Sequence, residues 1–334
     1  MKILIIRFSS IGDIVLTTPA IRCIKQQLPL AQVHFLSKRS FKTVTEHNPY
    51  IDKFFYYDNN MEELITQLKT ERYDHIVDLH KNFRTLTIRR ALKTNTLSYK
   101  KLSIQKFLLT RLGINLMPGR HISQRCLDAV KPLGVKDDGK GLDYFIAEKD
   151  KIKETDLPTS HMHGFIAIVI GASYYTKKLP VHKLQALCNT MNYPIVLVGG
   201  KEDTTEGEAI AAIDPIKIYN SCGRFSLNES ADIIRRSKLV ISHDTGMQYI
   251  ACAFHKQVLA VWGGTSPKLD VEPYYGSATP SRQETAPYTN YIVPRLSCQP
   301  CSNYGTKKCP LGHFKCMELQ DVQALAAEAL NRIL

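Results

Sequence analysis

The chain has 334 residues, of which 44% are hydrophobic, and a formal net charge of +13 at pH 7. This length suits two domains with separate cores, and the longest apolar runs, such as 165–172, fall far short of the roughly 20 residues that a membrane-spanning helix needs. Arg7 interrupts the first apolar run and no small-residue cleavage site follows, so we expect no signal peptide and a cytoplasmic protein.

The excess positive charge lies in the first half of the chain. Residues 1–150 contain 25 Lys and Arg against 15 Asp and Glu, whereas the remainder contains 19 against 16. No acidic residue occurs from Leu79 to Leu127. The basic residues of this tract are Lys81, Arg84, Arg89, Arg90, Lys93, Lys100, Lys101, Lys106, Arg111, Arg120 and Arg125. Such a tract favours an anionic partner, namely nucleic acid, an anionic membrane or a phosphorylated or carboxylated substrate; a solvated face is the alternative.

The first part of the chain alternates between short apolar runs and helical patterns. Strands are predicted over 2–8, 32–37, 53–58 and 75–80, and a helix over 12–28. This alternation favours a parallel sheet with crossover helices.

After a polar stretch at 148–164 the same alternation resumes. Strands are predicted over 165–173, 194–200, 239–246 and 257–264, and helices over 180–191, 226–237 with Ser226 as N-cap, 247–254 and, strongly amphipathic, 319–334. We therefore predict an α/β protein of two doubly wound domains, 1–155 and 156–317, followed by a C-terminal helix at 318–334.

Ligands of open α/β sheets bind beyond the carboxyl ends of the strands, so the loops there are informative. These loops read SSIGD, GASYYTKK, GGKED, HDTG and GGTSP, and four of the five lie in the second half. Their Gly, Ser and Thr residues let backbone N–H groups approach phosphates at helix N-termini. The second domain is therefore predicted to bind the nucleotide, although neither a Walker P-loop nor G-x-G-x-x-G occurs.

Six segments together resemble the bacterial heptosyltransferases, glycosyltransferase family nine. They are RFSSIGDIVLTTPAI at 7–21, DLHKNFR at 78–84, GASYYTKKLP at 171–180, VGGKED at 198–203, DTG at 244–246 followed by IACAF, and GGTSP at 263–267. The resemblance implies two Rossmann-like domains facing each other across a cleft, the GT-B architecture. It also implies an ADP-heptose donor in the second domain, a lipopolysaccharide inner-core acceptor on the first, and an inverting transfer that needs no metal or other cofactor.

The resemblance assigns catalytic roles to two residues. An inverting transferase removes a proton from the acceptor hydroxyl while negative charge develops on the departing diphosphate. Asp13 matches the family's proposed general base; the alternative is that it caps its helix, and helix-end amides would lower its pKa. Lys177 matches the family lysine at the donor's phosphate or sugar, with Lys178 or a merely solvated lysine as alternatives.

The remaining site candidates lie on the strand-end loops, and Lys81, Arg84 and Arg120 are chosen because they flank such loops within the basic tract. The donor-binding candidates are Ser173, Glu202, Asp244, Thr245, Gly246 and Met247, although D-T-G alone is also compatible with an Asx-turn. The acceptor-binding candidates are Ser10, Gly12, Lys81, Arg84 and Arg120. Where the family commonly reads D-T-G-x-x-H, this chain has Tyr249, which cannot carry imidazolium charge near a diphosphate.

Four of the nine cysteines gather near the C-terminus as Cys298, Cys301, Cys309 and Cys316. They suit structural thiols, a zinc site or a disulfide, and a cytosolic setting disfavours the disulfide. His313 is either a ligand or a hydrogen-bonded loop residue.

These observations predict a heptosyltransferase that acts on a lipopolysaccharide or related surface glycan, peripherally on the inner face of the inner membrane. A transferase for another nucleotide sugar stays open because of Tyr249. An inactive nucleotide-sugar or anionic-glycan binding protein is a second alternative, which the presence of both Asp13 and Lys177 disfavours. Nucleic-acid binding is not expected, since no nucleic-acid motif occurs.

Overall fold

The computed structural model describes residues 1–276 and 287–333. Contacts between Cα atoms divide the described residues into two compact units. The first unit comprises 1–102, 120–145 and 274–276, and the second comprises 103–119, 146–273 and 287–333. This division differs from the predicted boundary at 155, and it assigns both 103–119 and the C-terminal helix to the second unit.

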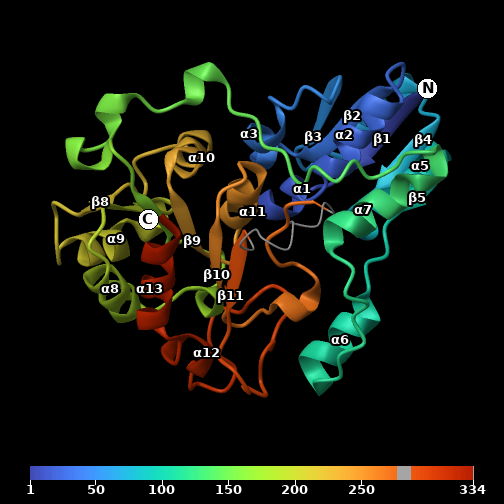
Figure 1. Ribbon diagram of the computed structural model, residues 1–334. Helices are drawn as coiled ribbons and strands as arrows, with labels where there is room; N and C mark the ends of the chain where they lie inside the picture. Colours follow the sequence, from blue (N-terminus) through green and yellow to red (C-terminus); the bar gives the residue numbers. More distant parts are fainter. Residues whose placement is uncertain (277–286, 334) are drawn as a thin grey trace. The chain divides into compact units, whose positions relative to one another are not determined.

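The first unit is built on five parallel strands in the order β3-β2-β1-β4-β5 (Figure 1). The strands are β1 (Lys2–Ile6), β2 (Gln32–Lys38), β3 (Lys53–Tyr57), β4 (His75–Asp78) and β5 (Asn95–Ser98). Residues 3–6 of β1 are fully buried, as expected for a central parallel strand that is covered on both faces. The four strands predicted in this part of the chain are present, and β5 is an additional, partly exposed edge strand.

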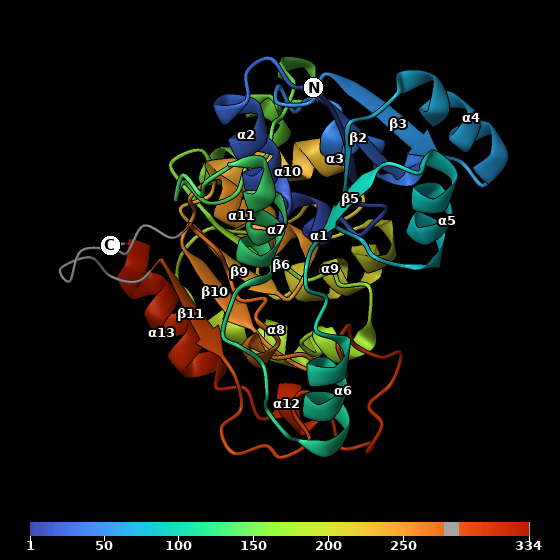
Figure 2. The same cartoon turned by 90° about the vertical axis from the view of Figure 1, so that its right-hand side faces the viewer.

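Helices join these strands and cover the sheet. They are α1 (Ile11–Val15), α2 (Thr18–Gln27), α3 (Lys42–Thr45), α4 (Met61–Glu71), α5 (Phe83–Leu92) and α7 (Ile122–Val130). Helix α2 packs against α7, and α4 packs against α5 (Figure 2). Leu4 and Ile6 of β1 share a core with Leu64 and Leu68 of α4.

The helix predicted over 12–28 is in fact two helices, α1 and α2. Pro19 has no N–H with which to bond the carbonyl of Val15, so the helical ladder is interrupted there. The hydroxyl of Thr18 donates to that carbonyl at 2.7 Å, and the hydroxyl of Thr17 donates to the carbonyl of Ile14 at 2.7 Å. The single-helix prediction was wrong because hydrophobic periodicity does not show that side-chain hydroxyls replace backbone N–H groups as hydrogen-bond donors at this point.

The second unit contains six parallel strands in the order β11-β10-β9-β6-β7-β8. They are β6 (Ile166–Val169), β7 (Ile195–Val198), β8 (Ile218–Asn220), β9 (Leu239–His243), β10 (Val258–Val261) and β11 (Tyr288–Tyr291). Its helices are α6 (Ser103–Leu112), α8 (Val181–Thr190), α9 (Thr204–Ala211), α10 (Leu227–Arg236), α11 (Gly246–Ala253), α12 (Lys315–Glu318) and α13 (Val322–Ile333). The four strands predicted here are present, whereas β8 and β11 were not predicted.

Two helix predictions in this unit are confirmed in detail. Ser226 is the N-cap of α10, where its hydroxyl accepts the N–H of Glu229 at 3.3 Å and its own N–H donates to the Glu229 carboxylate at 2.7 Å. The C-terminal amphipathic helix forms α13 and buries Leu325, Ala326 and Ala329 in the core of the second unit. Residue 334 of that prediction lies outside the described residues.

Within the described ranges, no helix combines the length and the apolar character that crossing a membrane would require.

Candidate active site

The loop that follows β1 brings Asp13 next to Arg7. One carboxylate oxygen of Asp13, Oδ1, lies 2.6 Å from Nη2 of Arg7. The other oxygen, Oδ2, accepts hydrogen bonds from the N–H and the hydroxyl of Ser10, at 3.2 and 3.0 Å. The Asp13 side chain keeps 30% of its surface exposed, while Arg7 is buried. Asp13 therefore does close a capping box at the start of α1, and its carboxylate also remains accessible.

The surroundings of Asp13 pull its pKa in opposite directions. Burial by itself would raise the pKa of the carboxyl, but the charge of Arg7 and the hydrogen bonds from Arg7 and Ser10 outweigh burial and lower it. Asp13 is consequently ionised at neutral pH. A lowered pKa also makes the carboxylate a weaker base than an isolated one.

Arg7 was not among the residues predicted for the site. Its Nε donates to the carbonyl of Ser9 at 3.0 Å, and its Nη1 donates to the carbonyl of Leu79, which follows β4. The guanidinium thus links the ends of two neighbouring strands and orients Asp13. The sequence does contain a signal for this role of Arg7, because a charged residue directly after a buried strand and just before a ligand loop is unusual.

Replacing Arg7 provides a pH test of this arrangement. We expect Arg7→Met to raise the pKa of Asp13 by about one unit or more, because burial then acts without the opposing charge. If Asp13 is the general base, the acid limb of the pH profile of kcat/KM moves to higher pH by the same amount. The wild-type profile should show no acid limb above about pH 5. As a matched control, Arg39→Met removes the exposed pair with Asp58 and should leave the profile unchanged.

An unchanged profile in Arg7→Met, with the melting temperature recorded for each variant, would contradict a titrating role for Asp13.

Lys81 lies on the loop between β4 and α5 and Arg84 in the first turn of α5, and both are exposed. Asp78, at the end of β4, accepts the N–H groups of His80 at 3.1 Å and Lys81 at 2.7 Å, which holds this loop in shape. The guanidinium of Arg84 lies 5.7 Å from the ring centre of Tyr57. Two predicted acceptor residues therefore lie close together in the sequence, at the start of α5.

The other predicted acceptor residues have different surroundings. Gly12 is buried within α1, next to Asp13. Arg120 makes a two-pronged ion pair with Asp128, at 2.5 and 2.7 Å, so its charge is already balanced. Of the predicted cations, Lys81 and Arg84 are thus better suited than Arg120 to meet an anionic acceptor.

In the second unit, the structure brings together the predicted residues Lys177 and Asp244. Lys177 ends the short 3-10 helix η6 (Tyr175–Lys177), and Asp244 directly follows β9. The Lys177 Nζ lies 2.7 Å from Asp244 Oδ2, and the two side chains are only 14% and 11% exposed. The same carboxylate oxygen accepts the hydroxyl of Thr265, from the GGTSP loop, at 2.8 Å. Three of the predicted ligand loops therefore converge on one carboxylate.

Lys178 turns to different partners. Its Nζ lies 2.8 Å from Asp203 and 2.5 Å from Glu206, which are on the segment after β7. Burial alone would lower the pKa of Lys178, but these two carboxylates outweigh it and raise the pKa. Lys178 thus links the segment after β6 to the segment after β7, whereas Lys177 contacts Asp244 of the D-T-G loop.

His243, which the sequence reasoning did not single out, supports the Lys177 segment. Its Nε2 accepts the backbone N–H of Leu179 at 2.9 Å, which ties residues 177–179 to the end of β9. Burial, together with the charges of Lys178 and Lys177, lowers the pKa of His243 to about 3. The imidazole is therefore neutral and acts as a fixed acceptor.

Helix α11 begins at the D-T-G loop, with Thr245 as N-cap and Gly246 and Met247 in its first turn. The Thr245 hydroxyl is buried and has no partner among the described residues. Gln248 is fully buried, and neither polar atom of its side-chain amide is paired with a described residue. A buried polar group without a partner costs about 1–3 kcal/mol. Such groups beside a helix N-terminus are typical of a site whose ligand supplies the missing partners.

Tyr249, which stands in place of the family histidine, is buried behind this loop. Its hydroxyl donates to the carbonyl of Val271 at 2.6 Å and lies 3.5 Å from Oδ1 of Asp244. The remaining donor candidates, Ser173 and Glu202, lie exposed on the segments after β6 and β7. The structure thus brings Lys177 to Asp244, which is followed directly by Thr245, Gly246 and Met247 at the start of α11.

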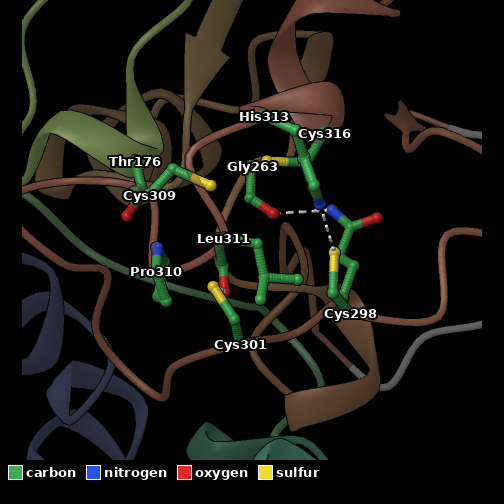
Figure 3. Close-up of a pocket in the computed structure, with 11 residues that line it drawn as sticks. Thr176, Gly263, Cys298, Cys301, Cys309, Pro310, Leu311, His313 and Cys316 are labelled. Atoms are coloured by element: carbon green, nitrogen blue, oxygen red, sulfur yellow. Dashed lines mark hydrogen bonds between the residues drawn. The ribbon is translucent and has the colours of Figure 1, made fainter.

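The four C-terminal cysteines line one small pocket of the second unit, together with His313 (Figure 3). The Cys298 Sγ lies 3.8 Å from Nε2 of His313, and all nine cysteines of the chain are free thiols. Burial raises the pKa of Cys316 to about 12 and also raises that of Cys301. In the part of the chain that the structure describes, no three His, Cys, Asp or Glu side chains are arranged to hold a metal ion. The structure thus gathers the four thiols and His313 around one pocket.

The chain is similar to a known protein family over most of its length. The family model of glycosyltransferase family 9 (heptosyltransferase) matches residues 61–315. Lipopolysaccharide heptosyltransferase 1 of Campylobacter coli is 23% identical over 292 residues, which cover 79% of this chain and 84% of the relative.

Two solved Escherichia coli structures share the fold over the whole chain. The ADP-heptose lipopolysaccharide heptosyltransferase II has 16% sequence identity and a TM-score of 0.72, covering 100% of this chain and 98% of that one. The heptosyltransferase WaaC with ADP has 17% identity and a TM-score of 0.69, covering 99% and 100%.

The two parallel-sheet units are those of the GT-B architecture, which the two solved heptosyltransferases share. The family match shows that the protein is a glycosyltransferase. The chain belongs to glycosyltransferase family 9, the heptosyltransferases. The family and the fold class predicted from the motifs are confirmed.

Proposed function

We propose that this protein transfers heptose from ADP-heptose to an anionic lipopolysaccharide inner-core acceptor, by an inverting reaction that needs no metal ion. The observation that carries the proposal is the Lys177–Asp244 pair, buried beside the N-terminus of α11. Family membership supports the heptose, and one solved relative is titled as a complex with ADP.

In the proposed reaction the acceptor hydroxyl oxygen attacks the anomeric carbon of the heptose. Its proton passes to the Asp13 carboxylate, and the bond between the anomeric carbon and the β-phosphate oxygen breaks, so that ADP leaves with the bonding pair. Inversion follows from this single displacement. Arg7 and Ser10 hold Asp13 in one orientation and keep it ionised before the proton arrives.

The charge that develops on ADP needs compensation. We infer that Lys177 provides it, exchanging part of its ion pair with Asp244 for the diphosphate oxygens. The backbone N–H groups at the start of α11 and the unpaired Thr245 hydroxyl add hydrogen bonds to the same group. Lys177 then contacts both Asp244 and the diphosphate, and Asp244 orients hydroxyl groups of the heptose.

The acceptor side of the proposal depends on the acid-free basic tract. The exposed side chains of Lys81, just before α5, and Arg84, in its first turn, suit carboxylates or phosphates of an inner-core glycan. Such an acceptor is lipid-linked, so we propose that the protein works peripherally on the inner face of the inner membrane.

Calorimetric titration of the purified protein under one salt condition tests the donor. We expect ADP-heptose and ADP to bind at least tenfold more tightly than UDP-glucose and GDP-mannose. A preference for the uridine or guanine ligand would overturn ADP-heptose as donor and keep the transferase fold.

A second candidate, a transferase for another nucleotide sugar, is favoured by one observation. Tyr249 replaces the family histidine and lies 3.5 Å from the proposed sugar-orienting Asp244. The same titration separates the two donors, since only the adenine pair should bind tightly in the leading proposal.

A further inference from the structure

Residues 103–119, which comprise α6 and the loop after it, carry a concentration of exposed apolar side chains. Five large ones occur within thirteen residues: Ile104 (73% exposed), Phe107 (57%), Leu112 (61%), Ile114 (48%) and Leu116 (59%). Single exposed apolar residues are ordinary on a protein surface, but a continuous set of them marks an interaction site. We call residues 103–119 the α6 segment.

The geometry of α6 separates an attached side from an outward side. Leu109 is buried and anchors the helix within the second unit. At 100° per residue, Ile104 and Phe107 lie on the side of the helix opposite Leu109, whereas Leu112 lies about 60° from Leu109. The helix therefore buries Leu109 and presents Ile104 and Phe107 to the outside. In Figures 1 and 2 the ribbon runs into and out of α6 through extended connections.

The charge of this region is of one sign. The α6 segment contains Lys106 and Arg111 and no acidic residue, and Lys100 and Lys101 precede it in the sequence. Apolar side chains next to lysine and arginine on one short helix are typical of segments that lie in the headgroup region of an anionic bilayer. Long basic side chains can keep their charges at the headgroups while their stems lie along the apolar surface.

We propose that the α6 segment docks the protein on an anionic lipid bilayer, with Ile104 and Phe107 inserted at the boundary between headgroups and acyl chains. The proposal rests on the proposed function, because a lipid-linked acceptor requires the enzyme to meet a membrane. A second copy of the chain is a poorer occupant, since it would bring two acid-free basic tracts of a +13 protein together.

Co-sedimentation of the full chain with vesicles tests the docking. Vesicles of phosphatidylethanolamine with about 30% phosphatidylglycerol serve as the anionic surface, and pure phosphatidylcholine serves as the neutral one. We expect binding to the anionic vesicles to be at least tenfold stronger, and to weaken in about 1 M salt, where charges are screened within about 3 Å.

Two double variants separate the segment from general surface hydrophobicity. Ile104→Ser with Phe107→Ser should lower the partition coefficient on anionic vesicles at least tenfold. The matched control, Leu30→Ser with Ile216→Ser, removes side chains that are 93% and 79% exposed and should bind like the wild type. ADP affinity should be unchanged in both, so a failure of the donor proposal appears separately, as weak ADP binding in every protein including the wild type.

A fluorescence measurement locates the inserted residue. The only tryptophan of the chain, Trp262, is fully buried, so it provides a constant background. Phe107→Trp should shift its emission to the blue on anionic vesicles and be quenched by brominated lipid, whereas the wild type should show neither change.

Three outcomes would overturn the docking proposal. The first is equal vesicle binding by the wild type and Ile104→Ser with Phe107→Ser. The second is equal binding to anionic and neutral vesicles. The third is a wild-type dimer in sedimentation velocity that the same double variant turns into a monomer, which would identify a second copy as the occupant.

Discussion

Asp13→Asn lowers kcat by about 10³-fold, within the usual range for the loss of a general base, while the Kd for ADP stays within about threefold. The expected result follows from the contacts of the carboxylate. The amide still fills the space between Arg7 and Ser10, but it cannot take the proton of the acceptor hydroxyl. Steady-state transfer kinetics and calorimetry with ADP measure the two quantities.

The control for Asp13→Asn must be a variant that loses a helix-capping carboxylate but keeps the proposed general base. Glu229→Gln does so, because Glu229 closes the equivalent capping box with Ser226 at the start of α10. Glu229→Gln should lose about 0.3–1 kcal/mol of unfolding free energy. Asp13→Asn should lose more, because it also leaves the buried Arg7 without its carboxylate partner. Only Asp13→Asn should lose turnover. If turnover falls only in proportion to folded protein in both variants, Asp13 is a cap and the base lies elsewhere.

Lys177→Ala raises the KM for ADP-heptose and the Kd for ADP by about 10–100-fold, and it also lowers kcat. The lysine is 14% exposed and pairs with a carboxylate that is 11% exposed, so its removal leaves the Asp244 charge uncompensated where the diphosphate should bind. Both the lost attraction and the remaining negative charge weaken ADP binding.

The neighbouring lysine provides the matched control for Lys177→Ala. Lys178→Ala removes the same charge one residue away, but it breaks the contacts with Asp203 and Glu206 instead. We expect Lys178→Ala to lower the unfolding free energy while donor affinity stays within about threefold of the wild type. A loss of acceptor affinity alone in Lys177→Ala would show that the units have the opposite roles.

Much of the architecture could be predicted because it depends on residues that are close in the sequence. Uniformly apolar runs bounded by turn residues correspond to β1, β6 and β7, since buried parallel strands need apolar side chains on both faces. The Ser226 cap was equally readable, because its partner lies three residues away. Edge strands such as β5 escaped prediction, because their mixed side chains are only partly buried and their pairing partners are distant in the sequence.

In the candidate site, the loops and the residue types could be predicted from the sequence, and the motif resemblance singled out Asp13, Lys177 and Asp244. Which charged side chains pair with one another could not be predicted, because it depends on the folded chain. The Lys177–Asp244 pair joins residues 67 positions apart, and the bond from Arg7 to Leu79 joins residues 72 positions apart. Pairings of this kind depend on the order in which strands assemble in a sheet. A local pattern describes how one strand or helix forms, and it contains no information about which distant loop will lie beside it.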